Sequence, residues 1–310
     1  RVLITVEDLA SNKIFVERTS VGPSKFKGRL FSERGAYRIP HLLEQMKDGS
    51  IYLSFTRFKR IPVVALIKAL GVTKDEEIMM LISEGDAQYS DDLFINLYNA
   101  VNLKTEEDAL DLISRHFGVA QKEGKIEKTQ ENLDRYLLPH LGLTSKDRSN
   151  KAYNLCKLVG KFLKIAKNDI VIDKDHYMNK RLKLSGDLLM DLFRINLRAL
   201  VNDLLYNFQR LVKRGKFSSL KIIIRDKLLT SRIQSAMATG AWVGGRKGIS
   251  QNIDRTNYLA SISHLQRVVS LLSSTQENFQ ARALHPTHYG RLCPIETPEG
   301  TSIGLRKNLT

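Results

Sequence analysis

The alternation of hydrophobic and polar residues changes along the chain, from a strand-like period near the N-terminus to a helical period in the middle. Val2–Val6 and Lys13–Glu17 are rich in strand-forming residues and are separated by the turn formers Ser11 and Asn12, which predicts a β-hairpin. Ile51–Phe58 alternates polar and apolar residues, which predicts another strand.

From Pro62 onward the apolar residues recur with a helical period. Pro62 suits the first turn of a helix, and Gly71 is expected to end that helix. The pattern at Thr73 predicts a capping box for the next helix, and Thr105 is expected to begin another that runs through Phe117. Further helices are predicted at 130–141, 148–166, 187–213 and 219–238, with a short one at 253–263.

The helix predicted for Asp187–Lys213 carries a continuous apolar stripe. Its members are Leu189, Phe193, Leu197, Leu200, Leu204, Phe208 and Leu211. A stripe of this kind predicts a face buried in a hydrophobic core rather than a cofactor site. We expect the helices of this region to pack back on the N-terminal strands.

The last part of the chain has no regular apolar period. The segment His285–Gly304, HPTHYGRLCPIETPEGTSIG, is dense in Pro, Gly and hydrogen-bonding side chains, so an irregular, shaped loop is expected. The predicted fold class is therefore α+β: a mainly helical part with small antiparallel β elements, followed by a loop-rich region.

The charge of the chain is strongly positive and unevenly distributed. With 49 Lys and Arg against 33 Asp and Glu, the formal net charge of the 310 residues is +16. Asp75–Asp111 contains eleven acidic residues and one lysine, for which we favour a solvated helical face. Arg194–Arg232 contains ten basic residues and two acidic ones, which suits contact with a polyanion such as nucleic acid.

The two cysteines indicate a reduced compartment. Cys156 lies in an apolar helical run and is expected in a core, and the chain has no paired Cys-x-x-Cys motif. No signal peptide and no apolar run of membrane length is present, so a cytoplasmic protein is expected. Arg1 is not a starting Met, and we expect a natural segment to precede it.

Three sets of residues invite a catalytic or metal-binding hypothesis. Asp173 and Asp175 follow an apolar strand-like run, an arrangement that can hold Mg²⁺ through oxygen ligands. Such short motifs are weak evidence, and we favour a loop-organising role. His285, His288 and Cys293 lack a fourth zinc ligand, so histidines held by backbone hydrogen bonds are expected. The glycines around Trp242 do not match the Walker A pattern, because Lys247 is followed by Gly248 where the pattern needs Ser or Thr.

Four segments, in order, resemble the second-largest subunit of multi-subunit DNA-directed RNA polymerases. His285–Gly304 resembles the fork of that family, and Gly248–Ser270, GISQNIDRTNYLASISHLQRVVS, resembles its stretch beside the RNA–DNA hybrid. Asp173–Leu189 and Ala236–Gly245 resemble two further signatures. The amino-acid sequence of these motifs is similar to that of the split archaeal form of this subunit, called B″.

The resemblance implies a domain organisation. Residues 1–180 would form the lobe with adjoining protrusion elements, 181–245 a basic helical segment, and 246–310 the fork region. The chain would line the downstream DNA cleft and the hybrid, and would position template and nucleotide during transcription. Its partners would be the largest polymerase subunit, the continuation of the second-largest subunit, the DNA template and the RNA–DNA hybrid, with no membrane involved.

The resemblance also implies site residues. Those expected to contact nucleic acid are Gln251, Arg255, His264, Arg267 and Arg282, and Glu299 is expected to touch the mobile trigger loop of the largest subunit. No catalytic residue, metal site or bound cofactor is expected in this chain, because the family holds its catalytic Mg²⁺ in the largest subunit. In the same region we interpret Asn257 and Gln266 as structural residues of a capped helix that has an exposed polar face.

Two rival hypotheses stay open at this point. One is a self-sufficient Mg²⁺-dependent nucleotidyltransferase that uses Asp173 and Asp175. The other is a basic nucleic-acid-binding scaffold unrelated to polymerase. The polymerase hypothesis predicts that this chain alone is inactive.

Overall fold

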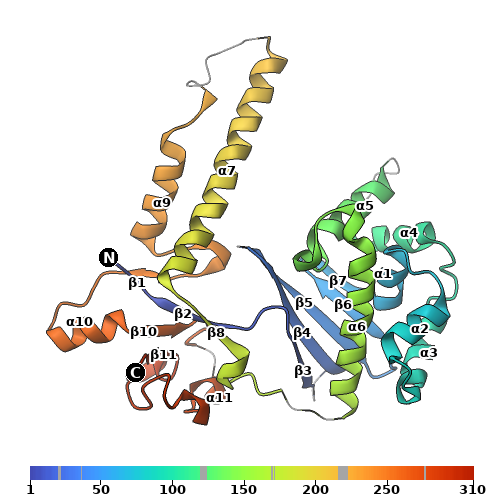
Figure 1. Cartoon of the computed structure of the whole chain (residues 1–310), viewed down its shortest axis with the longest axis horizontal. Coiled ribbons are helices and arrows are strands. Elements are labelled where there is room, and N and C mark those ends of the chain that lie inside the picture. The colour runs from blue at the N-terminus through green and yellow to red at the C-terminus, as the bar shows by residue number, and fades with distance from the viewer. Residues whose placement is uncertain are drawn as a thin grey trace. The chain divides into compact units, whose positions relative to one another are not determined.

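The computed structural model describes residues 1–19, 22–35, 37–118, 124–168, 170, 172–215, 223–275 and 277–310. The chain divides into two compact units (Figure 1). One unit, here called the inserted unit, consists of Ser11–Ile172. The other, here called the split unit, combines Arg1–Ala10 with Asp173–Thr310.

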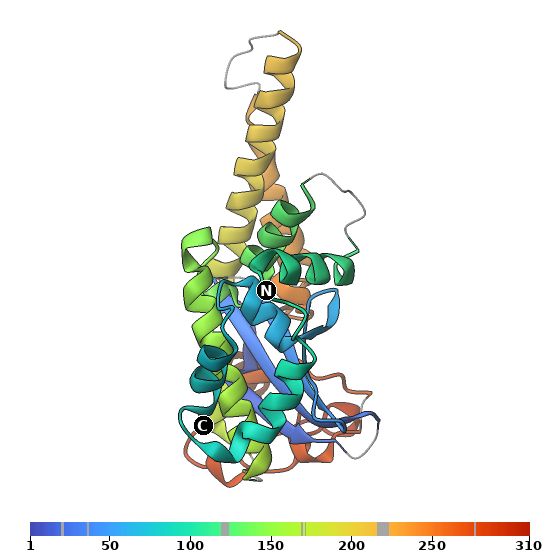
Figure 2. The same cartoon turned by 90° about the vertical axis from the view of Figure 1, so that its right-hand side faces the viewer.

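The inserted unit is built on an antiparallel sheet of five strands in sequential order. These are β3 (Ile14–Arg18), β4 (Ser24–Arg34), β5 (Tyr37–Met46), β6 (Ile51–Phe55) and β7 (Phe58–Pro62). Residues of β4 alternate between buried and accessible positions, so one face of the sheet is covered and the other is open. Figure 2 views this unit with its helices in front of the sheet.

Helices form the second layer of the inserted unit. They are α1 (Val63–Ala69), α2 (Asp75–Ser83), α3 (Ser90–Tyr98), α4 (Glu106–His116), α5 (Lys125–Tyr136) and α6 (Arg148–Lys167). The predicted core position of Cys156 on α6 is confirmed, since the side chain is fully buried. Gly160 lets α6 approach α2 closely, because a Cβ at Gly160 would lie 2.4 Å from the carbonyl oxygen of Ile82.

The split unit is built on a four-stranded sheet with the order β11-β10-β2-β8. Its strands are β2 (Thr5–Leu9), β8 (Lys180–Lys183), β10 (Arg267–Ser270) and β11 (Arg306–Asn308), of which β2 and β10 run parallel. A separate pair joins β1 (Val2–Leu3) to β9 (Ser250–Gln251). The helices are α7 (Ser185–Lys213), α9 (Lys227–Thr239), α10 (Tyr258–Leu265) and α11 (Phe279–Arg282).

The predicted helices are largely confirmed, with corrections at their ends. Thr105 begins α4 through a complete capping box with Asp108, as predicted. Thr73 makes no such box: Lys74 is the N-cap residue of α2 and its side chain makes no capping hydrogen bond. The helix predicted for 130–141 begins earlier, at Lys125, and ends at Tyr136, because Leu138 adopts a left-handed conformation before Pro139. The helix predicted from 219 is described from Lys227, and residues 219–222 lie outside the described residues.

The predicted N-terminal hairpin is wrong. Val2–Leu3 pairs with residues near 250, β2 pairs with β8 and β10, and β3 pairs with β4. Each of these β1 and β2 partners is more than 170 residues away in sequence, so local turn formers carry no information about them. Ile51–Phe58 is also not one strand, because Thr56, with φ of 51°, turns the chain between β6 and β7.

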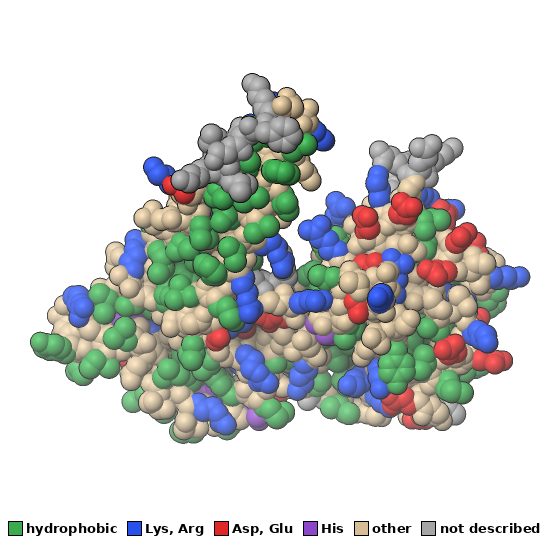
Figure 3. Space-filling model, turned by 45° about the horizontal axis from the view of Figure 1, so that its top comes forward, with side chains coloured by type: hydrophobic (Ala, Val, Ile, Leu, Met, Phe, Trp, Pro, Cys, Tyr) green, Lys and Arg blue, Asp and Glu red, His purple; other side chains and the backbone are tan. Residues whose placement is uncertain are grey.

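The apolar stripe on α7 is not the buried core that its period predicts. The first turns do pack back on the N-terminal strands as expected, since Leu188 and Leu192 cluster with Val6 and Trp242. Further along, Phe193, Leu197 and Phe208 are between 41% and 48% exposed. Figure 3 shows hydrophobic side chains over the visible face of the part that bears α7 and α9. An apolar stripe predicts a helix face that is stable when buried, but the surface that buries it need not belong to the same chain.

Two further expectations are confirmed. Acidic residues of the 75–111 stretch lie on solvated faces of α2, α3 and α4, including Glu76, Asp91 and Glu107. Between Pro286 and Gly304 the backbone forms only two short 3-10 turns, η6 (Pro286–His288) and η7 (Gly300–Ser302), and one isolated bridge.

Candidate nucleic-acid interface

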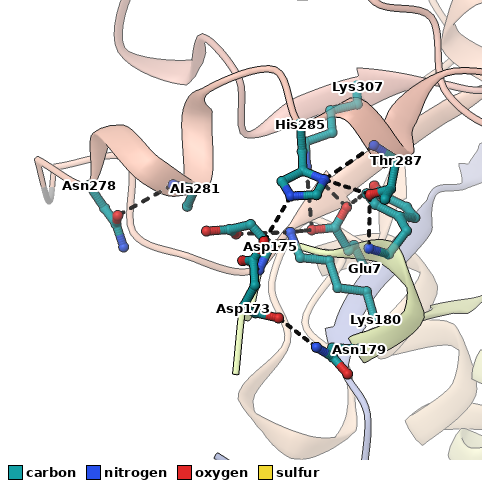
Figure 4. A network of polar contacts seen from close by, with 11 residues as sticks. Glu7, Asp173, Asp175, Asn179, Lys180, Asn278, Ala281, His285, Thr287 and Lys307 are labelled. Carbon is teal, nitrogen blue, oxygen red and sulfur yellow. Dashed lines mark hydrogen bonds and ion pairs between the residues drawn. The ribbon is translucent and has the colours of Figure 1, made fainter. Parts of the chain in front are cut away.

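A buried ion cluster connects three strands of the split unit (Figure 4). The carboxylate of Glu7 on β2 forms ion pairs with two lysines. Its Oε1 lies 2.9 Å from Nζ of Lys180 on β8, and its Oε2 lies 3.1 Å from Nζ of Lys307 on β11. The hydroxyl of Tyr177 also donates to the Glu7 carboxylate. All three charged side chains are at most 9% exposed, so the cluster fixes the sheet from which the candidate interface extends.

The cluster shifts the pKa values of its members. Burial by itself raises the pKa of Glu7, but Lys180, Lys307 and the Tyr177 hydrogen bond together hold it below its usual value. Burial lowers the pKa of Lys307, and the Glu7 carboxylate opposes that effect. Burial and the adjacent Glu7 raise the pKa of the Tyr177 hydroxyl, which therefore stays a donor.

Asp173 and Asp175 organise the loop before β8. Asp173 accepts the backbone N–H of Asp175 at 2.8 Å, and its other oxygen lies 2.8 Å from Nε2 of His285. Asp175 pairs with Lys180 at 3.2 Å. The backbone hydrogen bond is the loop-organising contact that we predicted, and it is the main cause that lowers the pKa of Asp173.

His285 and His288 belong to the same region but have different surroundings. Nδ1 of His285 accepts the N–H of Thr287 at 3.2 Å, as the expectation of backbone-held histidines requires. Nε2 of His288 is buried and has no hydrogen-bond partner among the described residues. Burial and the nearby Lys307 lower the pKa of His288 to about 4, so its ring is neutral.

Gln251 and His264 are hydrogen-bonded to each other within Gly248–Ser270, the segment that resembles the family's stretch beside the RNA–DNA hybrid. Asp254 donates its backbone N–H to Nδ1 of His264 at 3.0 Å, so the proton of the neutral ring is on Nε2. That Nε2 lies 3.0 Å from Oε1 of Gln251, whose amide nitrogen donates to the carbonyl of Gly248 at 2.8 Å. His264 is 4% exposed and burial lowers its pKa, so this structure gives it the role of orienting Gln251.

The arginines near this group differ in their accessibility. Arg255 is exposed in the loop before α10, and Arg267 is partly exposed at the start of β10. Arg282 donates to the backbone carbonyls of Thr301, Ile303 and Ser274 at 2.7 to 2.9 Å. Its guanidinium therefore joins α11 to two loops.

Three other residues singled out from the sequence are placed as follows. Glu299 is exposed immediately before the turn η7. Asn257 caps α10 by accepting the N–H of Ala260 at 2.6 Å, which confirms the predicted capping role. Gln266 is exposed at the C-terminal end of the same helix.

A cationic strand face in the inserted unit was missed in the sequence analysis. Lys25, Lys27 and Arg29 alternate with buried residues along β4, so they share the open face of the sheet. Lys27 lies 3.9 Å from Glu44 of β5, whereas Lys25 and Arg29 are exposed. The alternating sequence from Ser24 to Arg34 was the signal that could have revealed this strand.

The described ranges contain no helix that is both long and apolar enough to cross a membrane. They also contain no group of three or more His, Cys, Asp or Glu side chains arranged to hold a metal ion.

Comparison with known protein families identifies the class of protein. Residues 10–183 match the family model of RNA polymerase Rpb2, domain 2, and residues 251–310 match RNA polymerase Rpb2, domain 3. The chain therefore belongs to the RNA polymerase Rpb2 family. This confirms the resemblance to the second-largest polymerase subunit, and the hypothesis of a scaffold unrelated to polymerase is wrong.

Individual relatives are archaeal polymerase subunits, as the amino-acid sequence of the motifs predicts. The chain is 43% identical over 316 residues to DNA-directed RNA polymerase subunit Rpo2 of Saccharolobus solfataricus, covering 100% of this chain and 28% of that protein. It is 42% identical over 323 residues to subunit Rpo2N of Methanococcus vannielii, covering 100% of this chain and 63% of that protein. A similar match, 41% over 323 residues, is to Rpo2N of Methanocaldococcus jannaschii, with 99% and 63% covered. The chain thus spans less than two thirds of these relatives.

Proposed function

We propose that this chain is part of a DNA-directed RNA polymerase and guides nucleic acid without supplying the catalytic metal. The observation that carries the proposal is the match of residues 251–310 to Rpb2 domain 3, the region that contains Arg267 and in which His264 lies 3.0 Å from Gln251. The relatives are named as subunits of DNA-directed RNA polymerase, which gives the reaction of the assembly as nucleotide transfer.

Within the proposed interface, each side chain has a role that its chemistry permits. The neutral His264 ring fixes the side-chain oxygen of Gln251, which leaves part of the amide group able to hydrogen-bond with sugar or phosphate of the hybrid. Arg255 and Arg267 supply positive charge for the phosphates. These groups orient nucleic acid but perform no bond chemistry.

Arg282 and Glu299 would act on the loop that follows. Arg282 holds the 301–303 backbone in place, so it would contribute to catalysis by shaping the fork near the incoming nucleotide. Glu299, exposed before η7, would contact the trigger loop of the largest subunit. Gly304 permits this packing, because a Cβ there would lie 2.4 Å from the carbonyl oxygen of Arg282.

The inserted unit would line the downstream DNA cleft as the lobe. Its support is the match of residues 10–183 to Rpb2 domain 2 and the cationic open face of β4, with Lys25 and Arg29 exposed. Phosphates of a DNA duplex suit such a face, because binding releases counterions. The basic segment of α7 and α9 would belong to the adjoining protrusion.

The catalytic Mg²⁺ would be held by the largest subunit rather than by Asp173 and Asp175. Both carboxylates already make contacts that the loop requires: Asp173 with His285 and the Asp175 backbone, and Asp175 with Lys180. A hard cation would have to displace these contacts. We therefore expect no nucleotide addition by this chain alone.

Co-purification and activity together test the proposed function. A tagged chain is expressed with the remaining subunits of an archaeal polymerase, isolated, and given Mg²⁺, nucleotides and a primed template. We expect the chain to recover the largest subunit and the assembly to extend the primer, whereas the purified chain does not. Extension by the purified chain, or a purified active polymerase that excludes it, would contradict the proposal.

A further inference from the structure

The inserted unit carries an apolar groove beside its core, with several large side chains exposed along it. The groove lies on α2 and α3, has a volume of about 920 Å³ and is lined in part by Met79, Met80, Phe94, Tyr98 and Val101. Met80 is 71% exposed and Tyr98 is 80% exposed. Soluble proteins rarely leave so many large apolar side chains contiguous and uncovered unless the surface binds something.

Helix α3 shows why these residues are not simply the edge of the core. Leu93 and Leu97 face inward and are 2% and 7% exposed. Phe94 and Tyr98, one position further along, are 56% and 80% exposed. The helix therefore has one apolar side that is buried in the core and a second that is largely exposed.

The surroundings of the groove are acidic. Asp75 and Glu76 line it, and both are exposed, as is the neighbouring Glu77. Asp75 is paired with the buried Lys68 at 2.8 Å, but Glu76 and Glu77 make no ion pair with any described residue. Figure 3 shows acidic side chains gathered on the visible face of this unit, although the chain as a whole carries a charge of +16.

We propose that the α2–α3 groove binds an amphipathic helix of a partner protein whose polar flanks are basic. The apolar face of such a helix, with anchors three or four residues apart, suits an apolar groove. The flexible Met79 and Met80 side chains adapt to the anchors, and Lys or Arg at the flanks pairs with Glu76 and its neighbours. Nucleic acid is not the occupant, because the acidic rim repels phosphates.

A designed peptide supplies the probe. It is a labelled helix of about 18 residues, roughly 27 Å long, with Leu or Phe on one face and Lys elsewhere. One control peptide has the same composition with its apolar residues scattered around the helix, and another has Glu in place of Lys. Binding to the complete chain is measured by fluorescence anisotropy at low and high salt.

Matched variants locate the binding. Tyr98→Ser is compared with Tyr153→Ser, which changes a tyrosine 44% exposed on α6 outside the groove. We expect Tyr98→Ser to weaken binding about tenfold or more, as for an interface anchor, and Tyr153→Ser to leave it unchanged. Val101→Ser repeats the test at a second lining residue, and thermal melting verifies that each variant is folded.

A charge exchange tests the rim. Glu76→Lys should weaken the basic peptide and strengthen the Glu-containing one, whereas Glu131→Lys on α5 should change neither. Failure of the basic peptide to bind, equal binding of the scattered peptide, or equal effects of the matched variants would overturn the proposal. So would dimerisation of the chain that Tyr98→Ser abolishes, because a second copy would then be the occupant.

Discussion

Replacing Glu7 by Gln should destabilise the split unit without changing its shape. The side chain is 6% exposed, and its carboxylate is shared by Lys180 at 2.9 Å and Lys307 at 3.1 Å. Gln keeps an oxygen for the Tyr177 hydroxyl but removes the negative charge. Lys180 retains Asp175, whereas Lys307 loses its only ion-pair partner among the described residues. Breaking a buried pair in this way costs about 3–5 kcal/mol of unfolding free energy.

The assay can be restricted to the split unit. Trp242 is the only tryptophan and lies in the core of that unit, so its fluorescence during urea unfolding reports on the split unit. The control is Glu131→Gln, a change of the same kind at an exposed residue of α5 in the inserted unit. A loss of less than about 1 kcal/mol for Glu7→Gln, typical of an exposed ion pair, would show that Glu7 does not form a strongly stabilising buried pair.

The dependence on pH has a definite sign. The folded pKa of Glu7 lies below its usual value of 4.5, so the unfolded chain takes up the proton first as the solution is acidified. The stabilisation by Glu7 is present above pH 4.5 and is lost as pH falls through the folded pKa. We expect wild type and Glu7→Gln to converge in stability in that acidic range, and divergence there would contradict the assignment.

Three further predictions concern other residues. His41 is fully buried, its Nε2 accepts the N–H of Leu138, and burial lowers its pKa to about 4. The unfolding free energy of the inserted unit should therefore fall by about 3 kcal/mol as pH falls from 6.5 to 4. Circular dichroism during urea unfolding should show this loss in wild type but not in His41→Phe. Arg282→Ala in the assembled polymerase should raise the barrier to elongation by about 1–3 kcal/mol, with assembly intact and little rescue by Lys, and an unchanged rate would refute the loop-shaping role. Asp175→Ala should keep the Mg²⁺ dependence and most activity while lowering heat resistance, and complete loss of activity in a correctly assembled complex would favour the rival metal site.

Local signals in the sequence predict the helices well. The Thr105 capping box and the long apolar period of α7 each determine structure within a few residues, so their predictions are confirmed. The strand pairing of Thr5–Leu9 depends on residues near 181 and 269, and no local pattern specifies such partners.

The candidate site shows a similar division. The resemblance around Gln251 gives the candidate residues, which stay a prediction, but it does not reveal the hydrogen bond by which His264 orients the Gln251 amide. Nor did it show that Arg282 is engaged with backbone carbonyls. Both features depend on loops that approach each other only in the folded chain. The exposed stripe of α7 could not be foreseen, because a period describes one helix and not what covers it.

Crosslinking from the growing end of the RNA tests whether residues 251–282 lie beside the RNA–DNA hybrid. A photoreactive 4-thiouridine is placed at the RNA 3′ end in an elongation complex assembled with this chain, and the labelled fragment is identified after cleavage. We expect label within residues 251–282 and a marked decrease for Gln251→Ala combined with Arg267→Ala. Label confined to other subunits, or to residues 11–172 of this chain, would contradict it.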